Sequence, residues 1–140
     1  MQKRDFLQKQ LDELAKVLGK IIMNILQLRS EGKINEAYTL ATESLIKKFK
    51  LDMENILALS QEDFRKLVIE SNTSNPVQLN YLAELLFTTG ELLKEKNEKQ
   101  KMKELFKRSF MIYDHLNKTE RTFSLDRQEK MDHIKKELQK

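Results

Sequence analysis

The sequence has 140 residues, 39% of them hydrophobic, which suits one compact domain with a single core over residues 1–140. Its 3 glycines and 1 proline, among many helix-forming residues, predict an all-α fold, and the absence of cysteine excludes disulfides, thiolate metal sites and cysteine nucleophiles. The formal net charge of +4 is uneven, at +4 over residues 1–50, −5 over residues 51–93 and +5 over residues 94–140, so an acidic middle lies between two basic flanks.

The first predicted element is a long helix over residues 6–29. Its apolar residues recur at spacings of three and four, which marks one helix face; they are Leu7, Leu11, Leu14, Leu18, Ile21, Ile22, Ile25 and Leu28. Phe6, Val17 and Leu26 widen this stripe beyond what one antiparallel neighbour needs. We therefore expect later helices, including the C-terminal one, to wrap this helix. The alternative is that part of it pairs with a second copy of the chain in a homodimer.

A second helix is predicted over residues 34–49. Gly32 can adopt the left-handed conformation that closes the first helix, and so short a connection predicts an antiparallel hairpin. Next, Asp52 can cap a short helix, and Ser60 can cap another that carries its apolar residues inward. The inward residues are Phe64, Leu67, Val68 and Ile69. Residues 71–76, Ser-Asn-Thr-Ser-Asn-Pro, predict a loop within the one domain.

The second half of the chain predicts another hairpin and a closing helix. Residues 77–95 are apolar nearly all round in their middle and should form the most buried helix. A polar turn at residues 94–99 leads into a further helical pattern over residues 102–116. Ser124 caps the last helix, whose inward residues are Leu125, Met131, Ile134 and Leu138. The chain thus predicts about six helices, built as two antiparallel hairpins around the long first helix.

Both hairpins resemble the tetratricopeptide repeat (TPR), in which small residues allow two helices to cross closely. The first resemblance rests on Gly32, Ile34 and Ala37, and the second on Gly90, Phe106 and Ser109. The two turns are separated by about twice the ~34 residues of that repeat. The resemblance therefore implies a TPR-like fold rather than a regular array.

A longer resemblance covers most of the chain. Residues 5–21, 79–93 and 123–138 are similar to a family of small bacterial TPR-like helical proteins without an assigned activity. This resemblance implies a cytoplasmic all-α protein, and it supplies no catalytic residue.

The sequence contains no recognisable catalytic or cofactor site. His115 and His133 each follow an aspartate, but neither has the spacing of a metal site, and we expect both to be exposed histidines near helix ends. There is no phosphate-binding glycine loop, and Ser60 and Ser124 are better explained as helix caps. We therefore expect a non-enzymatic protein with no cofactor and no metal. The charged N-terminal residues and the absence of a ~20-residue apolar run indicate a soluble, cytoplasmic protein that does not enter a membrane.

The leading functional hypothesis is a protein-protein interaction or scaffold module. In stacked hairpins the first helix of each hairpin lines a concave surface that suits a peptide or a partner helix. On the second hairpin the expected partner-binding residues are Tyr81, Glu84, Phe87, Thr88 and Glu91. The aromatic residues would anchor the partner and the glutamates would favour a basic segment. The competing interpretation is that Tyr81 and Phe87 belong to the core.

The alternative function is association with nucleic acid. Residues 94–108 carry 7 basic and 3 acidic side chains, and several lysines there could reach phosphates from one end of the second hairpin. These lysines are Lys99, Lys101, Lys103 and Lys107. The interleaved glutamates and the absence of a recognition helix make nucleic acid the less favoured partner.

Overall fold

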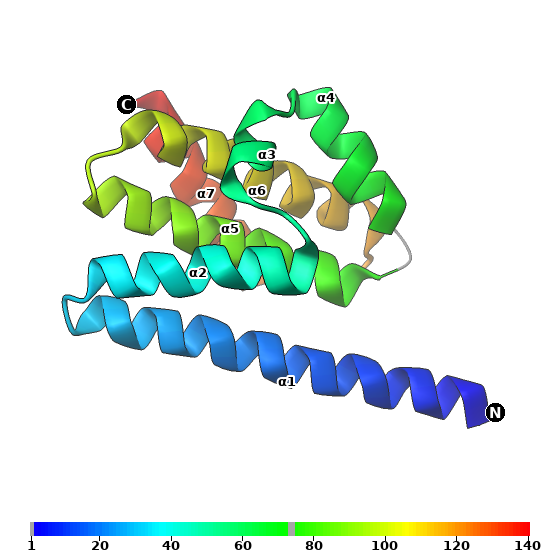
Figure 1. Ribbon diagram of the computed structural model, residues 1–140. Coiled ribbons are helices and arrows are strands. Elements are labelled where there is room, and N and C mark those ends of the chain that lie inside the picture. The colour runs from blue at the N-terminus through cyan, green and yellow to red at the C-terminus, as the bar shows by residue number, and fades with distance from the viewer. Residues whose placement is uncertain (1, 73–74) are drawn as a thin grey trace.

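A computed structural model describes the backbone of residues 2–72 and 75–140 and the side chains of residues 5–71 and 75–140. All the regular secondary structure in this part of the chain is helical, which confirms the predicted all-α class (Figure 1). The elements are α1 (Gln2–Ser30), α2 (Ile34–Phe49), α3 (Met53–Ala58), α4 (Gln61–Phe64), the π-helical turn η1 (Arg65–Ile69), the 3-10 turn η2 (Glu70–Asn72), α5 (Pro76–Glu95), α6 (Lys99–Thr119) and α7 (Leu125–Gln139). Seven α-helices are therefore described, where the sequence predicts about six. None of them is both long and apolar enough to cross a membrane.

The predicted helix boundaries depend on local hydrogen bonds that the structure contains. Gly32 has a φ of 78° in the turn after α1, as expected for a left-handed residue. The side chains of Asp52, Ser60 and Ser124 each accept a hydrogen bond from a backbone N–H in the first turn of α3, α4 and α7. These caps fix where the short middle helices and the last helix begin.

The core is centred on α5, which packs against α1, α2 and α6. At its crossing with α6, a Cβ atom added to Gly90 would lie 2.5 Å from the Phe106 ring, so this close approach requires glycine. About two turns earlier on α5, the Ser109 hydroxyl of α6 donates to the Ala83 carbonyl oxygen at 2.7 Å, and both residues are fully buried. Small residues therefore bring α5 and α6 close together.

The helices α1, α5 and α7 run parallel to one another, and α2 and α6 run in the opposite direction (Figure 1). Gly19 of α1 lies against Tyr81 of α5, and ten residues farther along both helices Arg29 lies 3.7 Å from Glu91. The contacts between α7 and α5 also follow a parallel order. Lys130 of α7 contacts Glu84 of α5, and Glu137, farther along α7, contacts Lys94, farther along α5. The helices α1, α5 and α7 therefore form one side of the molecule, while α3 and η1 pack on α6.

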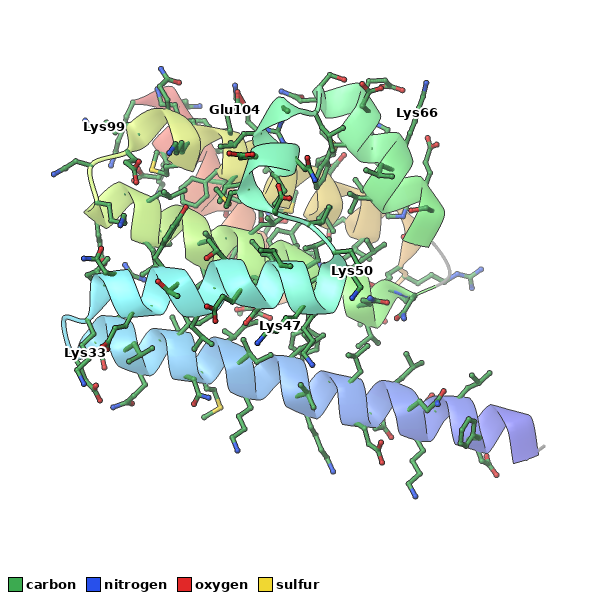
Figure 2. The ribbon with its side chains drawn as sticks, viewed as in Figure 1. Lys33, Lys47, Lys50, Lys66, Lys99 and Glu104 are labelled. Atoms are coloured by element: carbon green, nitrogen blue, oxygen red, sulfur yellow. The ribbon has the colours of Figure 1, made fainter. Side chains whose placement is uncertain are left out.

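The first turns of α1 extend past the rest of the protein. Figures 1 and 2 show this end of α1 projecting beyond α2, and the side chains of residues 5–10 are all exposed. Phe6 and Leu7 are 61% and 57% exposed there, although the apolar stripe continues through them. The expectation that later helices, including the C-terminal one, wrap α1 is therefore wrong for these turns. The neighbours of α1 are chiefly α2 and α5, and α2 ends level with the middle of α1 (Figure 1).

Two residues expected to face inward are exposed. Leu67 is 57% exposed because residues 65–69 form a π-helical turn, in which the 3.6-residue periodicity no longer predicts the buried face. Its neighbours Val68 and Ile69 are buried as expected. Leu125 is 63% exposed because it is the first residue of α7 and precedes the turns that pack on α6.

Candidate functional site

A groove lies on the side of the molecule formed by the parallel helices, between α1 and α5. Its volume is about 480 Å³, and we call it the α1–α5 groove. The lining residues are Ala15, Lys16, Gly19, Lys20, Ile22, Met23, Leu26, Tyr81 and Glu84. Seven of these nine come from α1, because Ala15, Gly19, Ile22 and Leu26 follow one another at helical spacing along the edge that faces α5.

The groove exposes apolar side chains of α1. Met23 is 70% exposed and Leu26 is 44% exposed, beside the partly buried ring of Tyr81. Exposed apolar side chains that lie together next to an aromatic residue are typical of an interaction site, whereas single ones are common on any surface. Methionine also adapts its shape to different partners.

The free charges at the groove are positive. Lys16 and Lys20 stand one helical turn apart on α1, are exposed, and form no ion pair with any described residue. Glu84, in contrast, pairs with Lys130 of α7 at 3.2 Å. Burial lowers the pKa of Lys130, but its contacts with Asp126 and Glu84 outweigh this effect and raise the pKa overall, so Lys130 stays charged.

Of the five predicted partner-binding residues, Tyr81 and Glu84 line the α1–α5 groove. Phe87 is partly buried and packs toward α6 and α7 instead, with its ring centroid 5.4 Å from that of Phe106 and 5.6 Å from that of His133. Its ring is thus shared between the core and the surface. Whether these side chains bind a partner stays a prediction.

The other two predicted residues are engaged within the chain. Thr88 is buried and its hydroxyl donates to the backbone oxygen of Glu84 at 2.9 Å. Glu91 lies between Arg29 of α1 at 3.7 Å and His133 of α7 at 3.1 Å. The glutamates that suggested a basic partner therefore already have basic neighbours in their own chain.

Polar contacts join α5 to α7 along the length of both helices. Lys94 donates to Glu137 at 2.8 Å near one end, and the buried Arg127 lies 3.4 Å from the Asn80 amide oxygen near the other. Hydrogen bonds from Lys94 and then Lys140 lower the pKa of Glu137 to about 2. Charged side chains thus join α7 to α5, whereas the apolar residues of α7 pack on α6.

Neither histidine lies in a metal site. Among the residues that the structure describes, no three His, Asp or Glu side chains are grouped so that they could hold a metal ion. His133 is not the free surface histidine that the sequence suggested, because it contacts Phe87, Phe106 and Glu91. His115 is partly buried on α6.

The basic segment 94–108 is divided between paired and unpaired lysines. Lys94 contacts Glu137, Lys96 donates to Asn35 and lies over the Tyr38 ring, and Lys101 pairs with Glu98. The remaining lysines, which form no ion pair with described residues, are Lys99, Lys103 and Lys107.

Sequence reasoning missed the contribution of α1 to the groove. Met23 lies outside the apolar stripe of the first helix, and Leu26 was noticed only because it widens that stripe. An exposed methionine next to a widened stripe was the one available signal.

No protein-family model, no curated protein sequence and no solved structure matches this chain.

Proposed function

We propose that the protein is a non-enzymatic interaction module with a TPR-like arrangement, which binds a segment of a partner protein in the α1–α5 groove. The observation that carries this proposal is the exposed apolar strip of Met23 and Leu26 beside Tyr81, between two parallel helices. A groove between parallel helices suits an extended or helical segment whose apolar side chains enter it.

The helix order supports the TPR-like part of the proposal. Helices of alternating direction, with α1, α5 and α7 on one side, are expected for two stacked hairpins followed by a closing helix. The segment 50–75 between the hairpins departs from such a repeat, but α3 and η1 pack on α6. The side formed by the parallel helices stays open. We also propose that the chain is related to the small bacterial TPR-like proteins that its sequence resembles.

The charges favour a partner segment that is apolar and acidic. Glu84 pairs with Lys130 at 3.2 Å, and Glu91 pairs with Arg29 at 3.7 Å. The unpaired cations at the groove are Lys16 and Lys20, which would meet carboxylates at the edge of the partner segment. This differs from the basic segment that the sequence suggested, because the sequence does not reveal these internal pairs.

The test is affinity capture from native lysate with matched variants. Met23→Glu and Leu26→Glu place a carboxylate in the groove at exposed positions, so the fold should persist by circular dichroism. Leu125→Glu is the control, since Leu125 is similarly exposed on α7. We expect a partner that the wild type and L125E retain and that both groove variants lose. Equal recovery by all four proteins would refute the groove as the binding site.

A nucleic-acid partner remains the second candidate because of one row of cations. Lys99, Lys103 and Lys107 follow one another at four-residue intervals on α6 and form no ion pair with described residues. A gel-shift assay at ~50 mM salt tests this candidate, since phosphate contacts are strongest at low salt. Binding that falls steeply with added salt and with Lys103→Gln would support it, and no binding would end it.

A further inference from the structure

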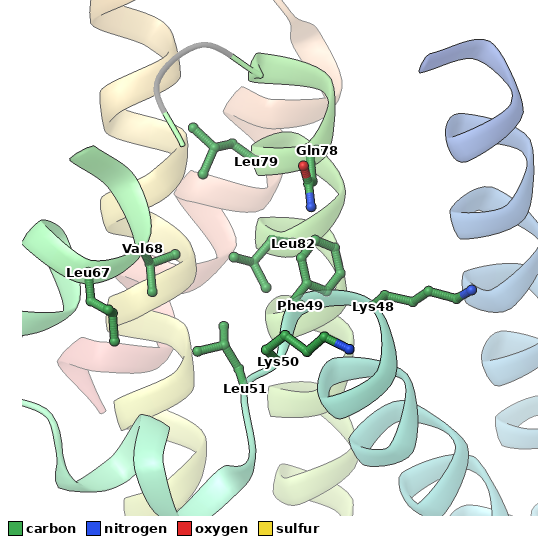
Figure 3. Close-up of a pocket in the computed structure, with 9 residues that line it drawn as sticks. All are labelled: Lys48, Phe49, Lys50, Leu51, Leu67, Val68, Gln78, Leu79 and Leu82. Carbon is green, nitrogen blue, oxygen red and sulfur yellow. The ribbon is translucent and has the colours of Figure 1, made fainter. Parts of the chain in front are cut away.

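A second site lies apart from the α1–α5 groove, where the end of α2, the π-helical turn η1 and the first turns of α5 meet (Figure 3). Its volume is about 340 Å³, toward the lower end of the ~300–1,000 Å³ typical of small-molecule sites. We call it the α2–η1 pocket. Its lining residues are Lys48, Phe49, Lys50, Leu51, Leu67, Val68, Gln78, Leu79 and Leu82.

The interior of the α2–η1 pocket is apolar. Leu51, Val68, Leu79 and Leu82 come from three separate segments, and each is at most 7% exposed. Figure 3 shows their side chains directed toward the same space. Leu67 is 57% exposed and lies at the edge. An apolar chain that entered here would replace contacts with water by contacts with these four side chains.

The rim of the pocket is cationic. Lys48 and Lys50 lie on the α2 side of the pocket, and Figure 3 shows their side chains extending outward from the apolar interior, in the direction of α1; neither forms an ion pair with a described residue. The nearby carboxylate of Asp52 is occupied by hydrogen bonds from Asn55. Gln78 belongs to the first turn of α5, where the helix dipole adds positive potential. The two unpaired ammonium groups therefore place positive charge on the outer side of this rim.

Two unusual backbone conformations occur beside this pocket. Lys50 has a φ of 59°, and among the described residues with positive φ it is the one that is neither Gly nor Asn. Leu67 and Val68 belong to η1, and π-helical turns occur frequently at functional sites. Both irregular segments therefore supply side chains to the same small volume.

We propose that the α2–η1 pocket binds a small amphiphilic carboxylate, a medium-length acyl chain with one carboxylate group. The chain would lie along Leu51, Val68, Leu79 and Leu82, and the carboxylate would lie at the rim beside Lys48 and Lys50. The apolar interior accounts for the chain, the unpaired lysines account for the charge, and the volume limits the ligand to a small one. This site is independent of partner binding in the α1–α5 groove.

The test uses decanoate as the probe, at concentrations where it is monomeric, with methyl NMR and calorimetry of the full chain. We expect shifts confined to the methyl groups of the apolar lining, which are those of Leu51, Leu67, Val68, Leu79 and Leu82, and a Kd on the order of 100 µM. The uncharged analogue 1-decanol should bind about tenfold more weakly, because it lacks the charge that the two lysines attract.

Variants separate the charge from the apolar interior. Lys48→Gln with Lys50→Asn removes both cations while Asn tolerates positive φ, and it should weaken decanoate about tenfold and leave 1-decanol unchanged. Lys47→Gln, beside the pocket but outside its lining, is the control. Leu67→Glu should abolish decanoate binding without loss of helicity, since Leu67 is exposed. The proposal is overturned by a decanoate Kd weaker than about 10 mM, by shifts centred elsewhere, or by equal affinity for decanoate and 1-decanol.

Discussion

Gly90 and Gly19 both lie inside helices, but they have different surroundings. At Gly90 an added Cβ would lie 2.5 Å from the fully buried Phe106 ring, which stacks on Phe87 and has no room to move. At Gly19 the nearest atom would be the Tyr81 hydroxyl oxygen at 3.6 Å, an ordinary contact. Only one of the two positions therefore requires glycine.

The paired substitutions give opposite results. Gly90→Ala should lower the free energy of unfolding by about 1–2 kcal/mol, because overpacking exceeds the gain in helix propensity. Gly19→Ala should raise it by about 0.5–1 kcal/mol, because alanine restricts the unfolded chain without strain. Urea denaturation followed by circular dichroism measures both. A stabilising G90A would show that the α5–α6 crossing is less close than described.

The backbone conformation of Lys50 should lower the stability of the folded protein. Its φ of 59° is unfavourable for a residue with a Cβ, so Lys50→Gly should raise the free energy of unfolding by about 0.5–1 kcal/mol despite the flexibility of glycine. Asn97→Gly is the matched control, because asparagine tolerates its φ of 61° and should gain less. Equal increases in melting temperature for both variants would mean that Lys50 is not strained.

Lys50→Gly should also weaken decanoate binding, because it removes one of the two lysines at the pocket rim.

At the scale of helices, α7 is held to α5 by ion pairs that respond to acid. The pKa of Glu137 is lowered to about 2 from an ordinary value of 4.5, so its ionised form favours the folded state. That contribution is complete above about pH 4.5 and is lost as the pH falls toward 2. Because Lys94 and Lys140 are substantially exposed, solvent reduces its size.

Glu137→Gln should therefore lower the free energy of unfolding by about 1 kcal/mol at pH 7. The difference from wild type should shrink as the pH falls from 4.5 toward 2, since both proteins then carry an uncharged side chain. Urea titrations at several pH values measure this difference, with exposed Glu129→Gln on the same helix as the control. A difference that does not depend on pH would contradict the lowered pKa.

The elements themselves could be predicted from the sequence because their signals are local. Apolar spacing predicted α1, α2, α5 and α6, and the capping side chains of Ser60 and Ser124 predicted the starts of α4 and α7. The groove could not be predicted, because Gly19 and Tyr81 meet across the fold and helical periodicity does not say which helix a residue faces. For the same reason the pairing of Glu84 with Lys130 was invisible. The inward orientation predicted for Leu67 was wrong because the π-helical turn interrupts the 3.6-residue periodicity on which the prediction rests.

For the whole molecule, the notable feature is the projecting end of α1, whose exposed Phe6 and Leu7 pack on no other described helix. Pro76, where α5 begins, precedes Tyr81 by five residues and so stands level with Leu14, five residues before Gly19. Residues 2–13 thus extend past α5 by about 18 Å. A helix of three turns that exposes Phe6 and Leu7 is marginal alone, and pairing would stabilise it.

We predict weak homodimerisation through this end of α1. The contact is small, so light scattering should detect a dimer only at high protein concentration. Leu7→Gln should shift the equilibrium to monomer and change the free energy of unfolding by less than about 0.5 kcal/mol, because Leu7 is exposed. A monomer at every concentration would contradict this prediction and leave the α1–α5 groove unaffected.

We propose that the α1–α5 groove binds an apolar, acidic segment of another protein. Photo-crosslinking tests it most directly, with a photoreactive amino acid at the exposed position of Met23 in the groove or at that of Leu125 on α7. We expect a crosslink to one partner from position 23 and none from position 125. We also expect the linked peptide to contain apolar residues next to aspartate or glutamate. Identical products from both positions, or none from position 23, would contradict the proposal.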